Sequence, residues 1–180
     1  MKQKIIKILE ETGALKFGDF TLASGEKSRY YIDLRVIPNF PGAFEELIGL
    51  AVNYLHKNCP EIEGVVAIPL AGIPFGTMIA NQLHKPFYLL RKEPKEHGLK
   101  KLIEGEIKNG QKILLVDDLI SSGFSKLFAI NALREEGANV ENLFVFIDRT
   151  SDTLTDFEKD HSIKIHYLIN VKDILNKVNN

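Results

Sequence analysis

Short apolar runs alternate with helical patterns through the second two thirds of the chain. The runs are rich in Val, Ile, Leu and Phe, and they span residues 64–68, 87–90, 112–116 and 143–147, with a further strand expected at 163–169. Helical patterns are expected near 73–84 and 124–136, and a short one from Val171. Strands that are apolar on both faces must be covered on both faces. The chain is therefore predicted to be an α/β protein with a doubly wound, mostly parallel sheet flanked by helices.

The N-terminal part has a different pattern. Residues 2–12 carry apolar side chains at helical spacing, residues 17–35 contain two β-type runs around a polar turn, and residues 43–57 again look helical. This arrangement predicts a small hairpin-like lobe before the main sheet. A chain of 180 residues, 44% of them hydrophobic, is long enough for one well-buried core and short for two. We therefore expect a single domain over residues 1–180.

Charge and cysteine content exclude several classes of protein. The chain has 23 basic and 24 acidic side chains, so no global charge draws it to nucleic acid or to an anionic membrane. Charges interrupt the apolar residues at the N-terminus, and we expect a cytoplasmic protein without a secretory signal. Cys59 is the single cysteine and can form no internal disulfide. The histidines at 56, 84, 161 and 166 lack ligand-like spacing and are interpreted as structural or surface residues.

The strongest motif follows the apolar run 112–116. Two acids at the carboxyl end of a parallel strand would lie in the crevice where open α/β sheets bind ligands, and carboxylates accept hydrogen bonds from ribose hydroxyls. A Ser/Gly loop at the start of a helix favours phosphate. The motif thus predicts a site for a ribose 5-phosphate, and the alternative is an acidic strand end followed by a serine helix cap. The predicted site residues are Asp117, Asp118, Leu119, Ile120, Ser121, Ser122, Gly123, Phe124 and Ser125.

A second motif, Pro69-Leu70-Ala71-Gly72, follows the first core strand. With Pro74 and Gly76, it places two prolines and two glycines within eight residues. Such a backbone can offer N–H groups to an anion at the start of the next helix. Residues Pro69, Leu70, Ala71 and Gly72 are therefore candidate ligands of an anion, although an ordinary strand-to-helix connection has the same pattern.

A third motif is a cationic stretch, residues 91–101, with five Lys or Arg against two Glu. Arg91, Lys92, Lys95 and His97 could neutralise the charge that builds on a departing anionic group. A solvated charged loop is the alternative. A Walker-type nucleotide loop is excluded because no Gly-Lys-Ser/Thr occurs.

Together these motifs resemble one family. The strand with two acids and a Ser/Gly loop resembles the ribose-phosphate signature of type I phosphoribosyltransferases. Arg-Lys-x-x-Lys-x-His-Gly at 91–98 resembles the catalytic loop of the orotate phosphoribosyltransferases, and residues 102–105 resemble its return strand. The N-terminal hood of that family resembles residues 20–25 and 28–33, which include Tyr30 and Tyr31. About residues 1–40 would contribute to this hood. Asp148-Arg149 is similar to its orotate-recognition position, where a planar guanidinium suits a carboxylate.

The resemblance implies a reaction and its participants. Phosphoribosyl pyrophosphate and orotate would give orotidine 5′-monophosphate and pyrophosphate. It implies that Asp117 and Asp118 hold the ribose, that residues 121–125 hold the 5′-phosphate, and that Lys95 and His97 act on pyrophosphate. Mg²⁺ would arrive with the substrate rather than in an all-protein cage. A homodimer with shared active sites is also implied.

Two positions depart from the family pattern. Phe124 stands where small residues are usual, and Ala23 stands where many members carry a lysine. These departures leave open a regulator that senses phosphoribosyl pyrophosphate without turnover. A transferase acting on another base is the nearer alternative, although a purine-base enzyme should lack the basic 91–98 motif.

Overall fold

The structure is a computed structural model of the chain, and it describes residues 1–21, 25, 27–93, 101–121, 123–150 and 154–178. Two compact units are present, residues 1–50 and residues 51–180. The single domain expected over residues 1–180 stays a prediction.

The first unit contains the small lobe that the sequence predicts. Helix α1 (Lys2–Glu11) buries Ile5, Ile6, Ile8 and Leu9. Strands β1 (Leu15–Thr21) and β2 (Lys27–Ile32) pair antiparallel, and the 3-10 helix η1 (Leu34–Asn39) follows. Helix α2 (Pro41–Asn58) begins in this unit and ends in the second.

The second unit is built on a six-stranded sheet. Its strands are β3 (Gly64–Ala67), β4 (Phe87–Leu90), β5 (Ile103–Glu104), β6 (Lys112–Ile120), β7 (Asn139–Asp148) and β8 (Lys164–Asn170). They lie in the order β5-β4-β3-β6-β7-β8, and every pairing is parallel except that of β4 with β5. The predicted fold class, a doubly wound and mostly parallel sheet, is confirmed.

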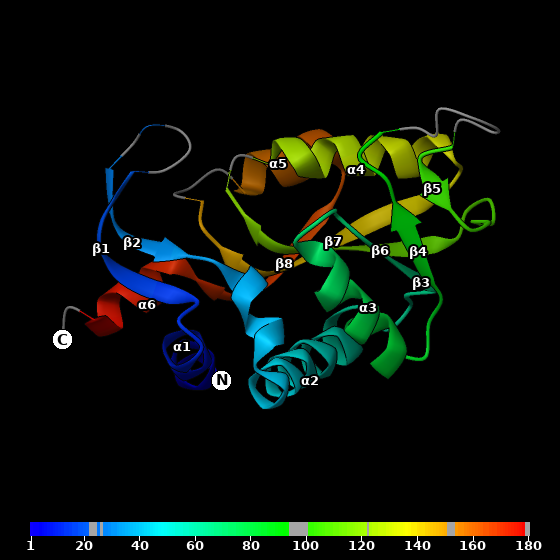
Figure 1. Cartoon of the computed structure of the whole chain (residues 1–180). Coiled ribbons are helices and arrows are strands. Elements are labelled where there is room, and N and C mark those ends of the chain that lie inside the picture. Colours follow the sequence, from blue (N-terminus) through cyan, green and yellow to red (C-terminus); the bar gives the residue numbers. More distant parts are fainter. Residues whose placement is uncertain (22–24, 26, 94–100, 122, 151–153, 179–180) are drawn as a thin grey trace. The chain divides into compact units, whose positions relative to one another are not determined.

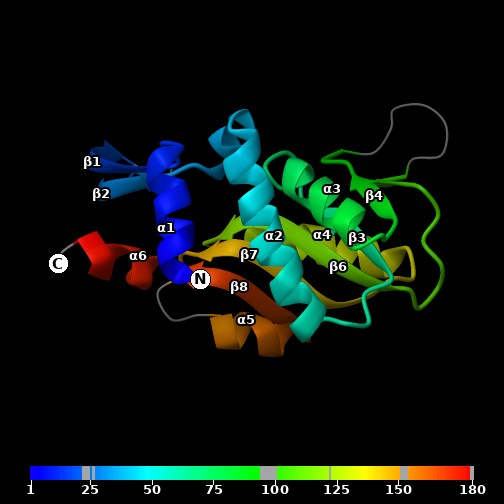
Figure 2. The same cartoon turned by 90° about the horizontal axis from the view of Figure 1, so that it is seen from below.

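Helices cover both faces of this sheet. Helices α4 (Phe124–Glu135) and α5 (Leu154–His161) lie on one face, and α3 (Gly72–Gln82) lies on the other with residues 51–58 of α2 (Figure 1). Figure 2, seen from below, shows α3 over the region of β3, β4 and β6, which it contacts. Helix α6 (Val171–Val178) follows β8 directly.

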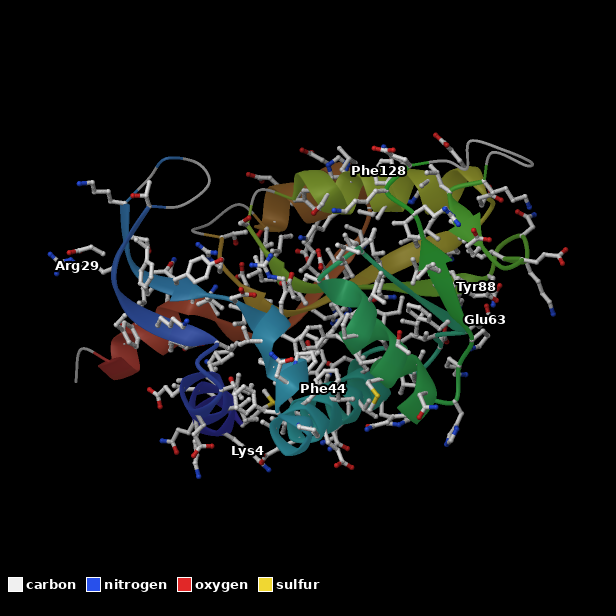
Figure 3. All side chains as sticks on the ribbon, in the orientation of Figure 1. Lys4, Arg29, Phe44, Glu63, Tyr88 and Phe128 are labelled. Atoms are coloured by element: carbon white, nitrogen blue, oxygen red, sulfur yellow. The ribbon has the colours of Figure 1, made fainter. Side chains whose placement is uncertain are left out.

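The core fills the two spaces between the sheet and its helices. On one side, Ile113 and Leu115 of β6 belong to a buried cluster with Ile130 and Leu133 of α4. On the other side, Phe75 of α3 packs on Phe146 of β7 with ring centroids 4.8 Å apart. Exposed apolar side chains such as Phe128 of α4 lie at the surface instead (Figure 3). Alternate residues of the central strands thus face opposite helical layers.

Strand order identifies the ligand-binding crevice that such a sheet offers. From β3 the chain passes to β4 on one side, and it returns at β6 on the other side of β3. This reversal is a topological switch point, and ligands of open α/β sheets bind outside the carboxyl ends of the strands there. The ends of β3 and β6 are therefore the place to look for a site.

The structure extends two of the predicted strands and adds the helices η1 and α5, which were not predicted. Strand β6 runs to Ile120 rather than ending at residue 116, because the two acids continue its pairing with β7, as in Asp117 opposite Val145. Strand β7 begins at Asn139, earlier than expected. Helix α5 was not predicted; it has eight residues and none of them is buried, so its apolar pattern is weak. In the part of the chain that is described, no helix is long and apolar enough to cross a membrane.

Candidate active site

Three of the predicted motifs meet at one edge of the sheet in the second unit. Residues 69–72 follow β3, residues 117–121 end β6, and Arg149 follows β7. Because β3, β6 and β7 are parallel neighbours, their carboxyl ends lie along the same edge. The switch point thus combines an acid pair, a helix N-terminus and a guanidinium.

Gly72 lets the start of α3 approach the end of β6. A Cβ at this position would lie 2.8 Å from the carbonyl oxygen of Val116 and 3.2 Å from Oδ1 of Asp117. No side chain fits into so short a distance without movement of the backbone. Of its neighbours in the motif, Leu70 is 71% exposed, so the segment has one side on the acids and one side in solvent.

The two acids have unequal surroundings. Asp117 is buried, and its carboxylate lies 2.7 Å from Nζ of Lys126 and accepts a hydrogen bond from the N–H of Asp118. Asp118 is partly exposed, and its Oδ1 accepts from the N–H of Leu119 at 2.7 Å. Burial, and then the negative charge of Asp117, raise the pKa of Asp118 to about 7. A proton is therefore held more readily at Asp118 than at an ordinary carboxylate.

The loop after β6 leads into α4 through Gly123. This residue is the N-cap of α4, has φ +79°, and no side chain caps the helix. Its carbonyl oxygen accepts hydrogen bonds from the N–H groups of Lys126 and Leu127. The serine helix cap that was the alternative is therefore not found, and a helix of 12 residues starts beside the acid pair with its positive end toward the loop.

The other predicted members of this loop differ in exposure. Ser121 and Ser125 are exposed and Leu119 is partly exposed, whereas the side chain of Ile120 is 1% exposed and belongs to the core. Any ligand contact at Ile120 would have to come from its backbone. Ser122 and the side chain of Phe124 lie outside the described part of the structure.

The cationic motif is described only at its two ends. Arg91 donates from its backbone N–H to the carbonyl oxygen of Leu102, and its Nε lies 2.7 Å from Glu104 of β5. This pairing anchors the base of the motif on the antiparallel strand that the resemblance implies. Lys92 is exposed. Lys95 and His97 lie in residues 94–100, outside the described residues.

Arg149 is placed by the pairing of β6 with β7. Ile120 lies opposite Asp148, and the N–H of Arg149 donates to the carbonyl oxygen of Ile120 at 2.9 Å. Asp148 itself is buried, and its carboxylate accepts from Thr150 and from Asn170. Asp148 therefore fixes the end of β7, and the backbone of Arg149 lies next to the end of β6. Tyr30 and Tyr31 belong to β2 of the first unit.

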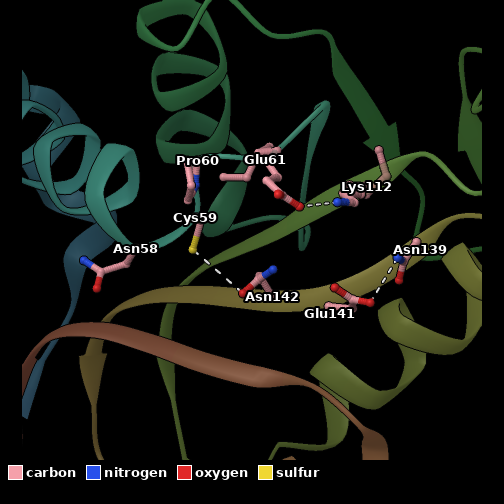
Figure 4. A pocket seen from close by; sticks show the side chains of 10 residues that line it. Asn58, Cys59, Pro60, Glu61, Lys112, Asn139, Glu141 and Asn142 are labelled. Atoms are coloured by element: carbon pink, nitrogen blue, oxygen red, sulfur yellow. Dashed lines mark hydrogen bonds and ion pairs between the residues drawn. The ribbon is translucent and has the colours of Figure 1, made fainter.

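A cavity of about 240 Å³ lies at the opposite edge, beside the amino ends of β6 and β7 (Figure 4). Cys59 lines it, and Sγ of Cys59 lies 3.3 Å from Nε2 of the buried His166. Burial raises the pKa of Cys59 to about 11 and lowers that of His166 to about 4. Both groups are therefore neutral near pH 7, so this pair lacks the thiolate of a nucleophile, and the cavity is separate from the predicted motifs.

Lys126 is the site residue that the sequence analysis missed. The predicted loop ended at Ser125, and Lys126 was not among the predicted site residues. Strand alternation contained the signal: Ile113 and Leu115 face α4, so Asp117 points toward α4 as well. An acid that is buried against a helix start requires a cation nearby.

Comparisons with known proteins identify the family of this chain. A family model described as a phosphoribosyl transferase domain matches residues 40–172. An orotate phosphoribosyltransferase from Pyrococcus abyssi is 36% identical over 174 residues, which cover 97% of this chain and 95% of the relative. The chain belongs to the orotate phosphoribosyltransferase family. Another member, from Methanocaldococcus jannaschii, is 35% identical over 96% of each chain.

A solved structure supports the same family membership. The crystal structure of orotate phosphoribosyltransferase from Aeropyrum pernix superimposes with a TM-score of 0.86 at 28% identity, covering 97% of this chain and 98% of that one. The resemblance inferred from the motifs is thereby confirmed for the chain as a whole.

Proposed function

We propose that this protein transfers the phosphoribosyl group of phosphoribosyl pyrophosphate to N1 of orotate, giving orotidine 5′-monophosphate and pyrophosphate. The observation that carries the proposal is the acid pair of β6 followed at once by the glycine-capped start of α4, at the switch point of the sheet. Family membership supports both the reaction and its acceptor.

Each part of the substrate has a complementary group at this edge. The acid pair supplies a carboxylate that accepts hydrogen bonds from the ribose hydroxyls, and the loop 121–125 offers N–H groups to the 5′-phosphate. Within residues 69–72, the backbone N–H groups of Leu70 and Ala71 are proposed to bind pyrophosphate, because Pro69 has no N–H and that of Gly72 donates to the carbonyl oxygen of Ile68. Arg149 can pair with the carboxylate of orotate through two parallel hydrogen bonds, and Tyr30 and Tyr31 are proposed to contribute from the lobe.

Bond cleavage develops opposite charges at two places. C1′ of the ribose becomes positive as the C1′–O bond to pyrophosphate breaks, and N1 of orotate forms the new bond as its proton is lost to the departing pyrophosphate or to water. The departing pyrophosphate gains negative charge, which Arg91, Lys92, Lys95 and His97 are proposed to stabilise. Preorganised cations of this kind act where charge appears in the transition state, and so they lower the barrier.

The described residues fit an Mg²⁺ ion that is held mainly by substrate. No group of three or more His, Cys, Asp and Glu side chains that could hold a metal occurs among the described residues. Asp118 remains as a partly exposed carboxylate, and Mg²⁺ is commonly bound by one or two carboxylates together with substrate oxygens. When bound with the substrate, Mg²⁺ would neutralise pyrophosphate and make it a better leaving group.

The assembly and its location are also proposed. A homodimer in which the 91–97 segment serves the neighbouring subunit's site follows from the family resemblance, and the cytoplasmic location predicted from the sequence is kept as part of this proposal. No nucleic acid or membrane partner is expected from a net charge of −1.

One assay separates the candidate acceptors. Purified protein with phosphoribosyl pyrophosphate and Mg²⁺ is offered orotate, uracil, adenine or hypoxanthine, and pyrophosphate release is measured. Release with orotate alone is expected. Release of pyrophosphate with another base would mean that this base, and not orotate, is the acceptor. Binding of phosphoribosyl pyrophosphate with no pyrophosphate release for any of the four bases would indicate a sensor.

A further inference from the structure

Lys126 forms a buried ion pair inside the ribose-phosphate motif. Lys126 is 6% exposed and Asp117 is 4% exposed, and their charged atoms are 2.7 Å apart. The same Nζ donates to Oγ of Ser125 at 3.2 Å. One lysine therefore connects the acid pair of β6 to the start of α4, which is proposed to contribute to the phosphate site.

The contacts of Asp117 leave little of its carboxylate for a ligand. Its Oδ2 takes the ion pair with Lys126, and its Oδ1 accepts from the N–H of Asp118. A Cβ added at Gly72 would lie 3.2 Å from Oδ1, so the start of α3 lies close to this oxygen. Asp118 is partly exposed, and among the described residues its carboxyl group interacts with the N–H of Leu119 and with the side chain of Asp117.

Burial of these two charges has a definite energetic consequence. An ion pair removed from water is tolerated when both partners are present, but removal of one partner leaves the other charge buried and uncompensated. Removal of the charge of Asp117 or of Lys126 alone is therefore expected to destabilise the site more than replacement of both side chains by neutral groups of similar size.

We propose that Lys126 is a positioning residue that binds Asp117 within the protein and fixes Ser125, so that Asp118 is the carboxylate that accepts the ribose hydroxyls. The two acids then have different roles: Asp117 orients the backbone of Asp118, and Asp118 contacts substrate. This division rests on the proposed function, since it assigns parts of the same phosphoribosyl pyrophosphate site.

Direct contact of Lys126 with a phosphate is the competing arrangement. The ammonium is nine-tenths buried and already has two oxygen partners. A lysine that contacted the substrate would be needed whether or not Asp117 carried a charge. The two arrangements therefore differ in how Asp117 and Lys126 depend on each other.

The test is a double-mutant cycle on binding and turnover. The dissociation constant for Mg²⁺–phosphoribosyl pyrophosphate, KM and kcat are measured for wild type, Asp117→Asn, Lys126→Met, the double variant and Asp118→Asn. Thermal unfolding of each protein sets a temperature at which all are folded, and Lys126→Arg is the conservative control. We expect each single change in the Asp117–Lys126 pair to weaken binding about tenfold or more, because a charge is left unpaired.

The double variant decides between the arrangements. We expect Asp117→Asn with Lys126→Met to recover most of the affinity, Lys126→Arg to retain more affinity than Lys126→Met, and Asp118→Asn to abolish binding. A double variant that binds more weakly than either single one, or an Asp117→Asn protein as impaired as Asp118→Asn, would overturn the inference alone. A wild-type protein that does not bind phosphoribosyl pyrophosphate would overturn the proposed function, and with it this inference.

Discussion

A Cβ added at Gly123 would lie 2.7 Å from Cε2 of Phe157, so that helix α5 packs directly against the glycine that starts α4. Gly123 also has φ +79°, a conformation that disfavours any side chain. Both constraints act on the backbone that is proposed to hold the 5′-phosphate.

Gly123→Ala is therefore expected to combine two penalties. The left-handed conformation costs about 1–2 kcal/mol, and the overlap with the Phe157 ring adds about 1–3 kcal/mol. Gly110→Ala is the matched control, because Gly110 has φ +76° and open space at its Cβ. Denaturant unfolding should show a greater loss of stability for Gly123→Ala, and calorimetry should show weaker substrate binding in that variant alone. Equal losses in the two variants would mean that Phe157 imposes no constraint.

Gly72→Ala should weaken substrate binding by displacing the start of α3 from β6. A Cβ 2.8 Å from a backbone oxygen cannot be accommodated by rotation of a side chain, and such overpacking costs about 1–3 kcal/mol. Gly49→Ala is the control. A Cβ at this helical position would enter open space, and the better helix propensity of alanine should raise the stability of the protein by up to about 1 kcal/mol. An unchanged dissociation constant for phosphoribosyl pyrophosphate in Gly72→Ala would contradict the close approach.

His166 predicts how stability depends on pH. Its folded pKa of about 4 lies below the ordinary 6.5, because the ring is buried. Between these pH values the unfolded chain binds a proton that the folded chain does not, so stability is fully present above about pH 6.5 and falls as pH decreases toward 4. The loss should be on the order of 2–3 kcal/mol.

Urea unfolding at a series of pH values measures this slope. His166→Gln removes the titrating group, and its stability should change less between pH 6.5 and 4 than that of wild type. His56→Gln, at an exposed position of α2, serves as the control that keeps the wild-type slope. Parallel slopes in wild type and His166→Gln would assign the acid sensitivity to other groups.

The cationic segment should act mainly on turnover. Lys95→Ala and His97→Ala are expected to lower kcat by on the order of 10²-fold while ground-state binding changes less, since the charge they stabilise appears as pyrophosphate leaves. Steady-state kinetics with calorimetric binding separates the two effects. A double variant with the wild-type rate would exclude the catalytic role.

Mixing variants tests whether the site is shared. If the segment serves the neighbouring subunit, Lys95→Ala protein mixed with Asp118→Asn protein should form hybrid dimers with one intact site and recover activity. Two Lys95→Ala preparations mixed together provide the control. Failure to recover activity after confirmed subunit exchange would contradict the shared site.

Local patterns predicted most of this fold, because they report directly on burial. Apolar runs such as 64–68 and 143–147 identified strands covered on both faces, and the motif 117–125 lies, as predicted, at the carboxyl end of a parallel strand. Patterns failed where tertiary contacts decide the structure. Asp117 remains within β6 because Lys126 neutralises it, and α5 forms on the core with none of its own residues buried. The contact between Cys59 and His166 joins residues 107 positions apart, which no local spacing reveals.

Formation of orotidine 5′-monophosphate by wild type and by Asp118→Asn is the most direct test of the central claim. Both proteins are assayed with phosphoribosyl pyrophosphate, orotate and Mg²⁺, beside Glu141→Gln, which changes an exposed acid at the opposite edge of the sheet. We predict product with wild type and with Glu141→Gln, and a loss of on the order of 10²-fold or more in kcat/KM with folded Asp118→Asn, because an amide does not provide a charged acceptor. A folded Asp118→Asn protein with the wild-type kcat/KM would contradict the account.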